Sequence, residues 1–456
     1  MIRMTGQELA AALRGRLHGP SDSRFEGVFT DTRNPRPGGL FVALKGPRFD
    51  AHDHVSADLT AAVLLVERPL DVPQPQVVVA DTHEALGQLA SHWRRRIPAR
   101  VIALTGSNGK TTTKEMLRGI LEAAGAVHAT AGNLNNEIGV PLTLLAMPED
   151  TEYAVIEMGA NHAGEIERMT RWTEPQVALI TNAARAHLEG FGSLEGVAHA
   201  KAEIFSGLPA QGGTAVINLD DPFADYWMSL NERHHILRFS LDGGGEVQGV
   251  WEAPDRLRLC VHGAERRVQL ASPGRHVAAN AVAAAAAASA VGVAIDTIAG
   301  GLARWRPLRG RLEERRHASG ARIWDDSYNA NPDSLRAGLE VLALMPGRRV
   351  LVLGAMGELG PGARALHAEL GAEARAMGIH HCLVLGDDAR AAAEAFGDAG
   401  ETFADHATLR QRLEQLLDAD TTALVKGSRS QHMEQIVEGL ELAREPQEAA
   451  DAVRAD

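Results

Sequence analysis

Apolar and polar residues follow three successive patterns along the chain. In the first pattern, short apolar runs are separated by clusters of proline and glycine, which is typical of brief strands joined by turns. These runs are residues 40–44, 61–66 and 76–80. In the second and third patterns, apolar runs alternate with segments of helical periodicity. That alternation predicts parallel sheets whose strands are connected by helices.

The points where one pattern gives way to the next predict three domains. The second pattern begins near Thr82 and closes in an alanine-rich helix after Asn280, and the third begins near Glu313. The strands predicted in the second region are residues 101–104, 154–156, 177–181 and 215–218. Those in the third are residues 323–324, 350–353, 382–385 and 423–425, with helices at 363–377 and 431–442. We therefore expect an α/β protein with domains at residues 1–82, 83–312 and 313–456.

Composition and charge narrow the class of protein. The 456 residues are 45% hydrophobic and 23% charged, as in an ordinary globular protein. The formal net charge of −13 argues against a protein that binds nucleic acid regardless of sequence, because phosphate neutralisation needs clustered Lys and Arg. An anionic small-molecule substrate is still compatible with this charge, since a local cationic pocket can lie in an acidic protein.

Cysteine usage and the apolar segments predict a soluble cytoplasmic protein. Cys260 and Cys382 lie far apart and have neither metal-ligand spacing nor the pattern of a disulfide framework. The N-terminal stretch has Thr5 and Glu8 in capping-box spacing and lacks the apolar core of a signal peptide. The most apolar helical segment, which starts at Ala281, is too short to cross a bilayer.

The stretch TGSNGKTT, residues 105–112, predicts a loop that binds nucleotide phosphates. It lies between an apolar strand and a helix, so its backbone N–H groups and the helix N-terminus would surround one point. Lys110 could reach the outer phosphates and the Thr111 hydroxyl could hold Mg²⁺. The spacing is unusual, because the common pattern has a glycine where Leu104 stands. The alternative interpretation is an ordinary strand-turn-helix corner with an incidental lysine.

Three polar residues are expected near this loop. Glu157 follows one predicted strand directly, His187 lies a few residues after another, and Lys201 lies further along. In open α/β sheets, ligands bind outside the carboxyl ends of the strands, where these residues would gather. A carboxylate and an imidazole there are candidate metal ligands, although Mg²⁺ prefers oxygen. Taken alone, each could be an ordinary surface or hydrogen-bonded polar side chain, which is the favoured interpretation for a lone histidine, so the hypothesis depends on all three sharing one edge.

Several ordered motifs resemble those of the Mur ligases. They are TGSNGKT, GNLNNEIGVPLTLL, EMGANHAGEI, AHLEGFGSLEGVAHAKAEIFSGL, DDSYNANPDS and KGSRSQHMEQIV, and DTRNPRPGGLFVALKGPRFDAHDH near the start is similar to the substrate-binding domain of the same family. The resemblance extends over all three regions. It also accounts for the unusual phosphate loop, because the family's loop has this spacing.

The resemblance implies a fold and an activity. It implies an N-terminal α/β substrate domain, a central P-loop domain with a parallel sheet, and a C-terminal Rossmann-like domain that binds the incoming group and closes on ATP. It also implies ATP-dependent amide formation through an acyl phosphate, with UDP-N-acetylmuramoyl-tripeptide and D-alanyl-D-alanine as substrates. A monomer that binds ATP and two Mg²⁺ ions, and no nucleic acid, is expected.

The resemblance also implies roles for individual residues. The loop residues expected to bind ATP are Gly106, Ser107, Asn108, Gly109, Lys110, Thr111 and Thr112. The expected metal residues are Thr111, Glu157, His187 and Lys201, with Lys201 converted by CO₂ to a carbamate. Lys110, Lys201, His187, Glu157 and Arg311 are the expected catalytic residues. Asn280, Arg311, Asp326, Tyr328, Asn329 and Asn331 would contact the nucleotide, and Thr32, Arg33, Lys45, Asn135 and Asn136 the UDP-linked substrate.

Two points in these assignments have alternatives. Lys201 could be an unmodified lysine paired with Glu203, and Val277 stands where the family usually has a first asparagine after His276. For the whole chain, the alternatives are a Mur ligase that adds the third peptide residue, a folylpolyglutamate synthetase relative, or a P-loop protein without ligase activity. The first usually carries an Asp-Asn-Pro-Arg motif, which this chain lacks. The second lacks the N-terminal region.

Overall fold

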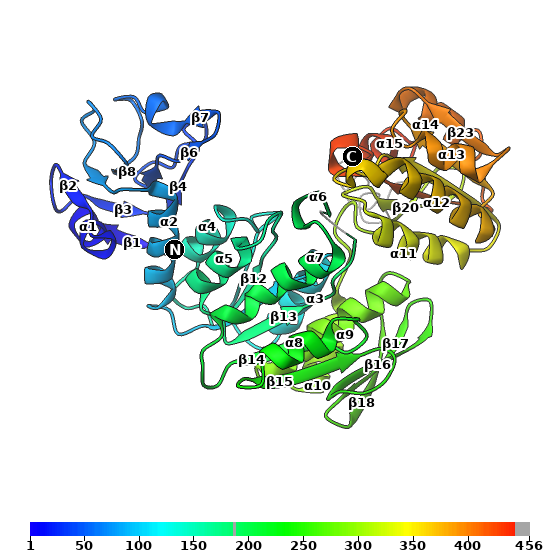
Figure 1. The fold of residues 1–456 in the computed structure, drawn as a ribbon, viewed down its shortest axis with the longest axis horizontal. Coiled ribbons are helices and arrows are strands. Elements are labelled where there is room, and N and C mark those ends of the chain that lie inside the picture. Colours follow the sequence, from blue (N-terminus) through cyan, green and yellow to red (C-terminus); the bar gives the residue numbers. More distant parts are fainter. Residues whose placement is uncertain (186–187, 443–456) are drawn as a thin grey trace, which may run out of the picture.

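Each of the three regions forms its own sheet in the computed structural model, which describes residues 1–185 and 188–442 (Figure 1). The N-terminal and C-terminal parts stand on opposite sides above the central part, and the β6–β7 hairpin (Lys45–Gly46 and Phe49–Asp50) lies on the side of the N-terminal part that faces the C-terminal part (Figure 1). The predicted α/β class with a three-domain architecture is confirmed. The predicted domain boundaries stay a prediction.

The N-terminal part is built on a five-stranded sheet in the order β2-β9-β8-β5-β4. These strands are Arg16–His18, Gln76–Val78, Val63–Val66, Leu40–Val42 and Val28–Phe29. A second ladder pairs β1 (Arg3–Thr5) with β3 (Arg24–Glu26). Helix α1 (Gly6–Leu13) begins at Thr5, which forms the predicted capping box with Glu8.

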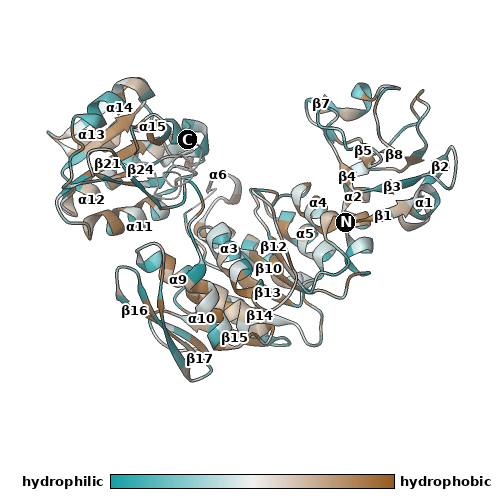
Figure 2. Cartoon of the chain, turned by 180° about the vertical axis from the view of Figure 1, so that it is seen from behind, coloured by the Kyte–Doolittle hydropathy of each residue, from teal (hydrophilic) through white to brown (hydrophobic). Residues whose placement is uncertain are grey.

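The central part is built on a nine-stranded sheet in the order β11-β12-β10-β13-β14-β15-β16-β17-β18. The strands are Val127–Ala129, Tyr153–Glu157, Arg100–Thr105, Val177–Ile180, Thr214–Asn218, His235–Ser240, Val247–Ala253, Arg256–Val261 and Ala264–Gln269. The first seven of these strands pair in parallel. Their inner members are continuous apolar runs, because helices cover both faces (Figure 2).

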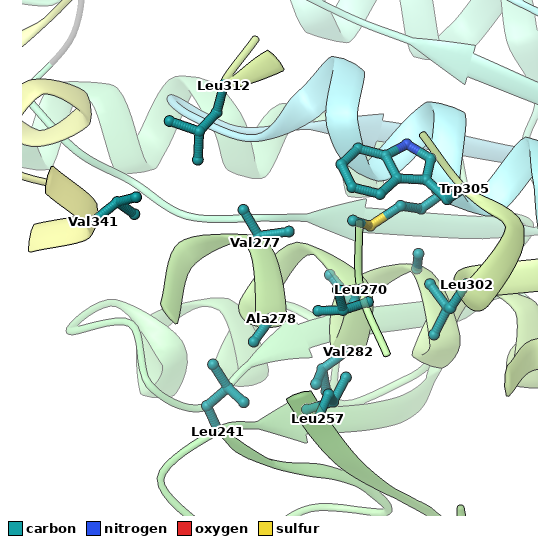
Figure 3. Packing of buried hydrophobic residues seen from close by; sticks show 14 of the residues in the cluster. Leu241, Leu257, Leu270, Val277, Ala278, Val282, Leu302, Trp305, Leu312 and Val341 are labelled. Carbon is teal, nitrogen blue, oxygen red and sulfur yellow. The ribbon is translucent and has the colours of Figure 1, made fainter. Parts of the chain in front are cut away.

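The helices of this part precede, connect or follow the strands. They are α2 (Thr82–Arg94), α3 (Lys110–Leu121), α4 (Gly139–Ala146), α5 (Glu165–Thr173), α6 (Leu188–Phe191), α7 (Leu194–Ala202), α8 (Ala224–Leu230), α9 (Arg275–Ala290) and α10 (Ile295–Arg304). The alanines of α9 let it pack closely on the sheet, so side chains such as Val277, Ala278 and Val282 meet Leu241 and Leu257 in one apolar cluster (Figure 3).

The C-terminal part is a six-stranded sheet in the order β19-β20-β24-β21-β22-β23. The strands are Glu313–Arg316, Arg322–Asp326, Thr421–Lys426, Arg348–Gly354, His381–Leu385 and Gly400–Phe403. The helices are α11 (Pro332–Ala343), α12 (Ala363–Ala376), α13 (Arg390–Phe396), α14 (His406–Glu414) and α15 (Glu434–Glu438). Apart from the β19–β20 pair, the strands are parallel.

Two predicted elements were wrong in extent. The helix predicted at 431–442 is only α15, because His432 has a left-handed backbone (φ 48°) and Leu442 leaves to pair with His317. Its buried apolar residues follow a helical period, which made the segment resemble a longer helix. The alanine-rich helix begins at Arg275, so Asn280 lies inside it and not before it. No helix in the described ranges is long and apolar enough to cross a membrane.

Candidate active site

The predicted phosphate loop joins β10 to α3, and its two glycines are required by the space around them. Gly106 has φ 151°, and a Cβ on it would lie 1.9 Å from Thr181 Oγ1. Gly109 has φ 79°, and a Cβ on it would lie 2.1 Å from Asn280 Oδ1. Any side chain at either position would therefore displace a neighbour and adopt a strained backbone.

The end of β13 holds this loop in shape. Asn182 Oδ1 accepts a hydrogen bond from Asn108 N at 3.0 Å, and Thr181 Oγ1 donates to Asn108 O at 2.7 Å. Ser107 Oγ donates to Ala184 O at 3.1 Å and accepts from Ala184 N at 2.9 Å. The loop is thus organised by the protein itself, which lowers the cost of ordering it around a ligand.

Lys110 is the first residue of α3 and folds back over the loop. Its Nζ donates to Gly106 O at 2.7 Å and to Ser107 O at 3.2 Å. Burial lowers the pKa of Lys110, the charge of Arg311 adds to this effect, and the carboxylate of Glu157 opposes it. The ammonium therefore lies where an outer phosphate could replace the loop carbonyls as its partner.

Thr111 and Glu157 meet beside Lys110. Thr111 Oγ1 donates to Glu157 Oε1 at 3.2 Å, and Asn135 Nδ2 donates to the same oxygen at 2.8 Å. Glu157 N in turn donates to Thr130 Oγ1 at 2.9 Å. Glu157 is the last residue of β12, at the edge of the sheet next to the phosphate loop. Its side chain is nevertheless only 1% exposed.

This arrangement suits a magnesium ion. A hydroxyl that donates its proton to a carboxylate keeps its lone pairs for a metal. In addition, no hydrogen-bond donor in the described part of the chain reaches the buried Oε2 of Glu157. Among residues 1–185 and 188–442, no group of three or more His, Cys, Asp or Glu could hold a metal ion. A Mg²⁺ ion here would therefore depend on phosphate oxygens and water for most of its ligands, which is usual for nucleotide-bound Mg²⁺.

Lys201 lies on α7 with its side chain fully buried. Burial, followed by the charge of Lys110, lowers the pKa of Lys201 from 10.5 to about 7. The Nζ lies 5.3 Å from the centre of the Phe191 ring. The carboxylate of Glu203, the alternative partner, accepts hydrogen bonds from the N–H groups of Gly164 and Glu167, so both of its oxygens are used at the start of α5. His187 lies outside the described residues.

Several of the predicted nucleotide-binding residues outside the loop lie near it. Asn331 begins α11 and exchanges two hydrogen bonds with the Asn108 side chain, at 2.7 and 3.4 Å. The Arg311 Cζ lies 4.2 Å from the centre of the Tyr328 ring. The charge of Arg311 also helps to lower the pKa of Lys110. Asn280 projects from α9 beside Gly109. Residues far apart in the sequence thus converge on one loop.

Asp326 and Asn329 are joined by a lysine that the sequence did not indicate. Lys426, at the end of β24, forms an ion pair with Asp326 and donates to Asn329 O at 3.1 Å. His276, at the start of α9, faces this pair. Burial lowers the pKa of His276 to about 4. Lys426 directly follows the strand predicted at residues 423–425, but only the observed pairing of β24 with β20 places it beside Asp326.

The predicted substrate residues lie in separate places. Thr32 and Arg33 lie in the N-terminal part, where Arg33 is exposed and paired with Asp31, and Lys45 lies in the β6–β7 hairpin. Asn135 contacts Glu157, so its amide faces the candidate metal site. Asn136 lies just before α4, where its Oδ1 accepts hydrogen bonds from Ile138 N at 3.2 Å and Gly139 N at 2.8 Å. The roles of all predicted site residues stay predictions.

A cavity of about 810 Å³ opens in the C-terminal part, at the carboxyl ends of β21 and β22. Arg364 and Arg390 line it together with the carboxylates of Asp387 and Glu394. The sheet order places β24, with Lys426, directly beside β21. The cavity and the Asp326–Lys426 pair therefore share one edge of the sheet.

Two stretches of the chain match models of known protein domains. Residues 104–288 match the Mur ligase middle domain, and residues 310–429 match the Mur ligase, glutamate ligase domain. Together these stretches contain the phosphate loop, Glu157, Lys201 and the C-terminal residues around Tyr328.

The similarity to individual proteins extends over nearly the whole chain. The UDP-N-acetylmuramoyl-tripeptide–D-alanyl-D-alanine ligase of Escherichia coli is 46% identical over 97% of this chain and 99% of the relative. A crystal structure of MurF from Acinetobacter baumannii superposes with a TM-score of 0.91 at 37% identity, over 97% of this chain and 99% of that one. The MurF ligase of Thermotoga maritima in complex with ADP gives a TM-score of 0.80 at 27% identity, over 91% of this chain and 97% of that one.

Proposed function

Because the chain belongs to the Mur ligase family, we propose that it joins D-alanyl-D-alanine to UDP-N-acetylmuramoyl-tripeptide, as its relatives' names describe, with ATP as the phosphoryl donor. The product, UDP-N-acetylmuramoyl-pentapeptide, serves peptidoglycan synthesis. We place this reaction in the cytoplasm and assign it to a monomer.

The observation that carries the proposal is the convergence of charged groups on Lys110. Lys110 Nζ donates to Gly106 O and Ser107 O in the loop, the charges of Glu157 and Arg311 affect its pKa, and its own charge lowers the pKa of Lys201. Together with Lys110, these three groups come from four elements or segments, namely α3, β12, α7 and the segment after α10. Phosphoryl transfer requires concentrated positive charge at one point, because negative charge develops between two anions.

The proposed reaction has two stages. First, an oxygen of the tripeptide carboxylate bonds to the γ-phosphorus of ATP, the bond to the bridging oxygen breaks, and ADP leaves. Second, the amine of D-alanyl-D-alanine attacks the acyl carbon, loses a proton, and phosphate departs. Phosphorylation is needed because a carboxylate is a poor electrophile without a leaving group. The contribution of Lys110 and Arg311 is to hold the phosphates in line.

We assign one Mg²⁺ ion to Thr111 and Glu157, and a second to Lys201 and His187. The ions would neutralise the charge that develops on the phosphates. For the second site, the amine nitrogen of neutral Lys201 bonds to the carbon of CO₂ and a proton is released to solvent, which leaves an anionic carbamate. The lowered pKa of Lys201 supports this assignment, because a lysine of ordinary pKa would be almost entirely protonated near pH 7.

We assign the UDP-linked substrate to the N-terminal part, with Thr32, Arg33 and Lys45, and the dipeptide to the C-terminal cavity. D-Alanyl-D-alanine carries one positive and one negative end. The cavity offers both signs of charge, in Arg364 and Arg390 and in Asp387 and Glu394. Variants of Arg364 should raise the KM for the dipeptide and leave the KM for ATP unchanged.

A phosphate-release assay tests the whole proposal. The enzyme is incubated with ATP, UDP-tripeptide and D-alanyl-D-alanine, and each component is omitted in turn. We expect phosphate release and the pentapeptide mass only when all three are present. A ligase that adds the third residue would require a different acceptor and amine, and a binding protein would release no phosphate.

The Lys110→Ala variant provides the control for the site. We expect its kcat/KM to fall by about 10²- to 10³-fold, as for the loss of one key electrostatic group. Its melting temperature should change little, because the hydrogen bonds of the Lys110 ammonium go to a loop that other residues also hold. A variant that stays fully active would overturn the assignment of the phosphate loop.

A further inference from the structure

Lys114 is a buried cation that the proposed function does not use. It lies on α3 one turn after Lys110, and its side chain is 1% exposed. Burying an ammonium costs free energy unless an opposite charge and hydrogen bonds compensate it. The buried ammonium of Lys114 must therefore have neighbouring groups that compensate its charge.

The contacts of Lys114 lead to the candidate metal site. Its Nζ donates to Thr130 O at 2.8 Å and forms an ion pair with Glu115 Oε1 at 3.1 Å. It also lies 3.7 Å from Glu157 Oε2. Thr130 contacts both groups, because its hydroxyl accepts the hydrogen bond from Glu157 N. Lys114 and Glu157 are thus linked through space and through one shared residue.

The two oxygens of Glu157 have different surroundings. Oε1 accepts hydrogen bonds from Thr111 and Asn135. Oε2 faces the Lys114 ammonium, and no donor among the described residues bonds to it. A carboxylate with a cation on one oxygen and the Thr111 hydroxyl on the other has a preferred orientation. Without the cation, that orientation would depend on two neutral donors alone.

We propose that Lys114 is a positioning residue for the Mg²⁺ site, which fixes the Glu157 carboxylate so that its Oε1 accepts the Thr111 proton. The Thr111 oxygen then keeps its lone pairs for the metal. This inference rests on the proposed function for the identity of the metal and nucleotide. It assigns Lys114 no contact with substrate, and its effect passes through Glu157.

Binding of Mn²⁺ in the presence of ATP, followed by electron paramagnetic resonance, tests the proposal without turnover. In Lys114→Met we expect Mn²⁺ affinity to fall by about 10- to 100-fold, as when an outer partner of a metal ligand is removed. Glu115→Gln is the matched control, because it removes the other carboxylate beside Lys114 and leaves Glu157 untouched. Its Mn²⁺ affinity should stay near that of the wild type.

A double variant separates positioning from simple stabilisation. Lys114→Met combined with Glu157→Gln should bind Mn²⁺ as Glu157→Gln alone does, because the neutral amide has no charge for Lys114 to hold. This comparison remains available if Lys114→Met alone fails to fold, since the double variant removes the buried Glu157 charge and leaves only Glu115, which also pairs with Arg118. Additive losses, or unchanged Mn²⁺ affinity in a folded Lys114→Met, would overturn the proposal. If the wild type forms no pentapeptide but the coupling persists, only the proposed function fails.

Discussion

At the scale of single residues, Lys201 has the property that carbamate formation needs. With a pKa of about 7, its amine is largely protonated at pH 6 and largely neutral at pH 8. We predict that enzyme depleted of CO₂ regains activity when bicarbonate is added, with a rate of recovery that rises with pH and is half-maximal near pH 7. Activity assays after gas exchange, together with ¹³C nuclear magnetic resonance of labelled bicarbonate, measure this.

The control for this prediction is Lys201→Arg, whose guanidinium stays charged. It should be inactive with or without bicarbonate and give no carbamate signal. Equal activity of the wild type in both conditions, with no carbamate signal, would contradict the prediction.

His276 is a second residue whose burial has a measurable consequence. Its folded-state pKa is about 4, against 6.5 for an unperturbed histidine, so the folded protein resists its protonation. The resulting stability is fully present above pH 6.5 and is lost as the pH falls from 6.5 towards 4. At pH 5 the loss attributable to this group is about 2 kcal/mol. Urea unfolding at pH 7.5 and pH 5 should show a smaller decrease for His276→Gln than for the wild type, and equal decreases would contradict the prediction.

At the scale of elements, the start of α11 connects two parts of the molecule. Asn331 caps this helix by accepting from Ser334 N at 2.9 Å, and it also bonds to Asn108 in the phosphate loop. We predict that Asn331→Ala loses about 1 kcal/mol of stability through the cap. It should also raise the KM for ATP about fivefold through the lost loop contact.

Asp405→Ala is the matched control for that prediction. Asp405 caps α14 in the same part of the molecule, accepting from Thr408 N at 2.8 Å, and α14 is remote in sequence from the loop contacts. It should lower the melting temperature similarly and leave the KM for ATP unchanged. An equal rise in KM for both variants would mean that Asn331 acts only through stability.

The elements also show what could be predicted from the sequence. Local signals sufficed for the Thr5–Glu8 capping box and for the strand-loop-helix at the phosphate loop, because both depend on adjacent residues. The β16–β18 hairpins were missed, since the exposed arginines of β18 mask its strand pattern. Contacts such as Asn108 with Asn331, or Lys114 with Glu157, depend on how separate elements pack. No spacing rule could have predicted them.

At the scale of the whole molecule, the N-terminal part shares its core with the central part. Ile2 and Leu9 belong to one apolar cluster with Leu86 and Trp93 of α2. Backbone pairing reinforces this, because Ile2 N donates to Leu145 O at 2.9 Å. Separating the two parts would expose this cluster to water, so we expect them to move together.

The C-terminal part also packs against the central part. Val341 of α11 and Val277 of α9 belong to one apolar cluster, and Asn331 and Asp333 add hydrogen bonds to Asn108 and Arg185 (Figure 3). The connecting segment contains Gly310 at φ 73° and Leu312 at φ 54°, and a leucine in the left-handed region is strained. A backbone held in such a conformation is a natural place for rotation, and it adjoins Arg311. We therefore infer that domain closure turns about residues 308–313.

Small-angle X-ray scattering measures that closure. We predict that the radius of gyration decreases when a non-hydrolysable ATP analogue and UDP-tripeptide are both present, because phosphate contacts from Lys110 and Arg311 would draw the C-terminal part onto the central sheet. Lys110→Ala should compact less at the same ligand concentrations, since one of the two contacts is missing. Identical scattering curves for the wild type with and without both ligands would show that the domains already hold their catalytic arrangement, and the strain at Leu312 would then need another explanation.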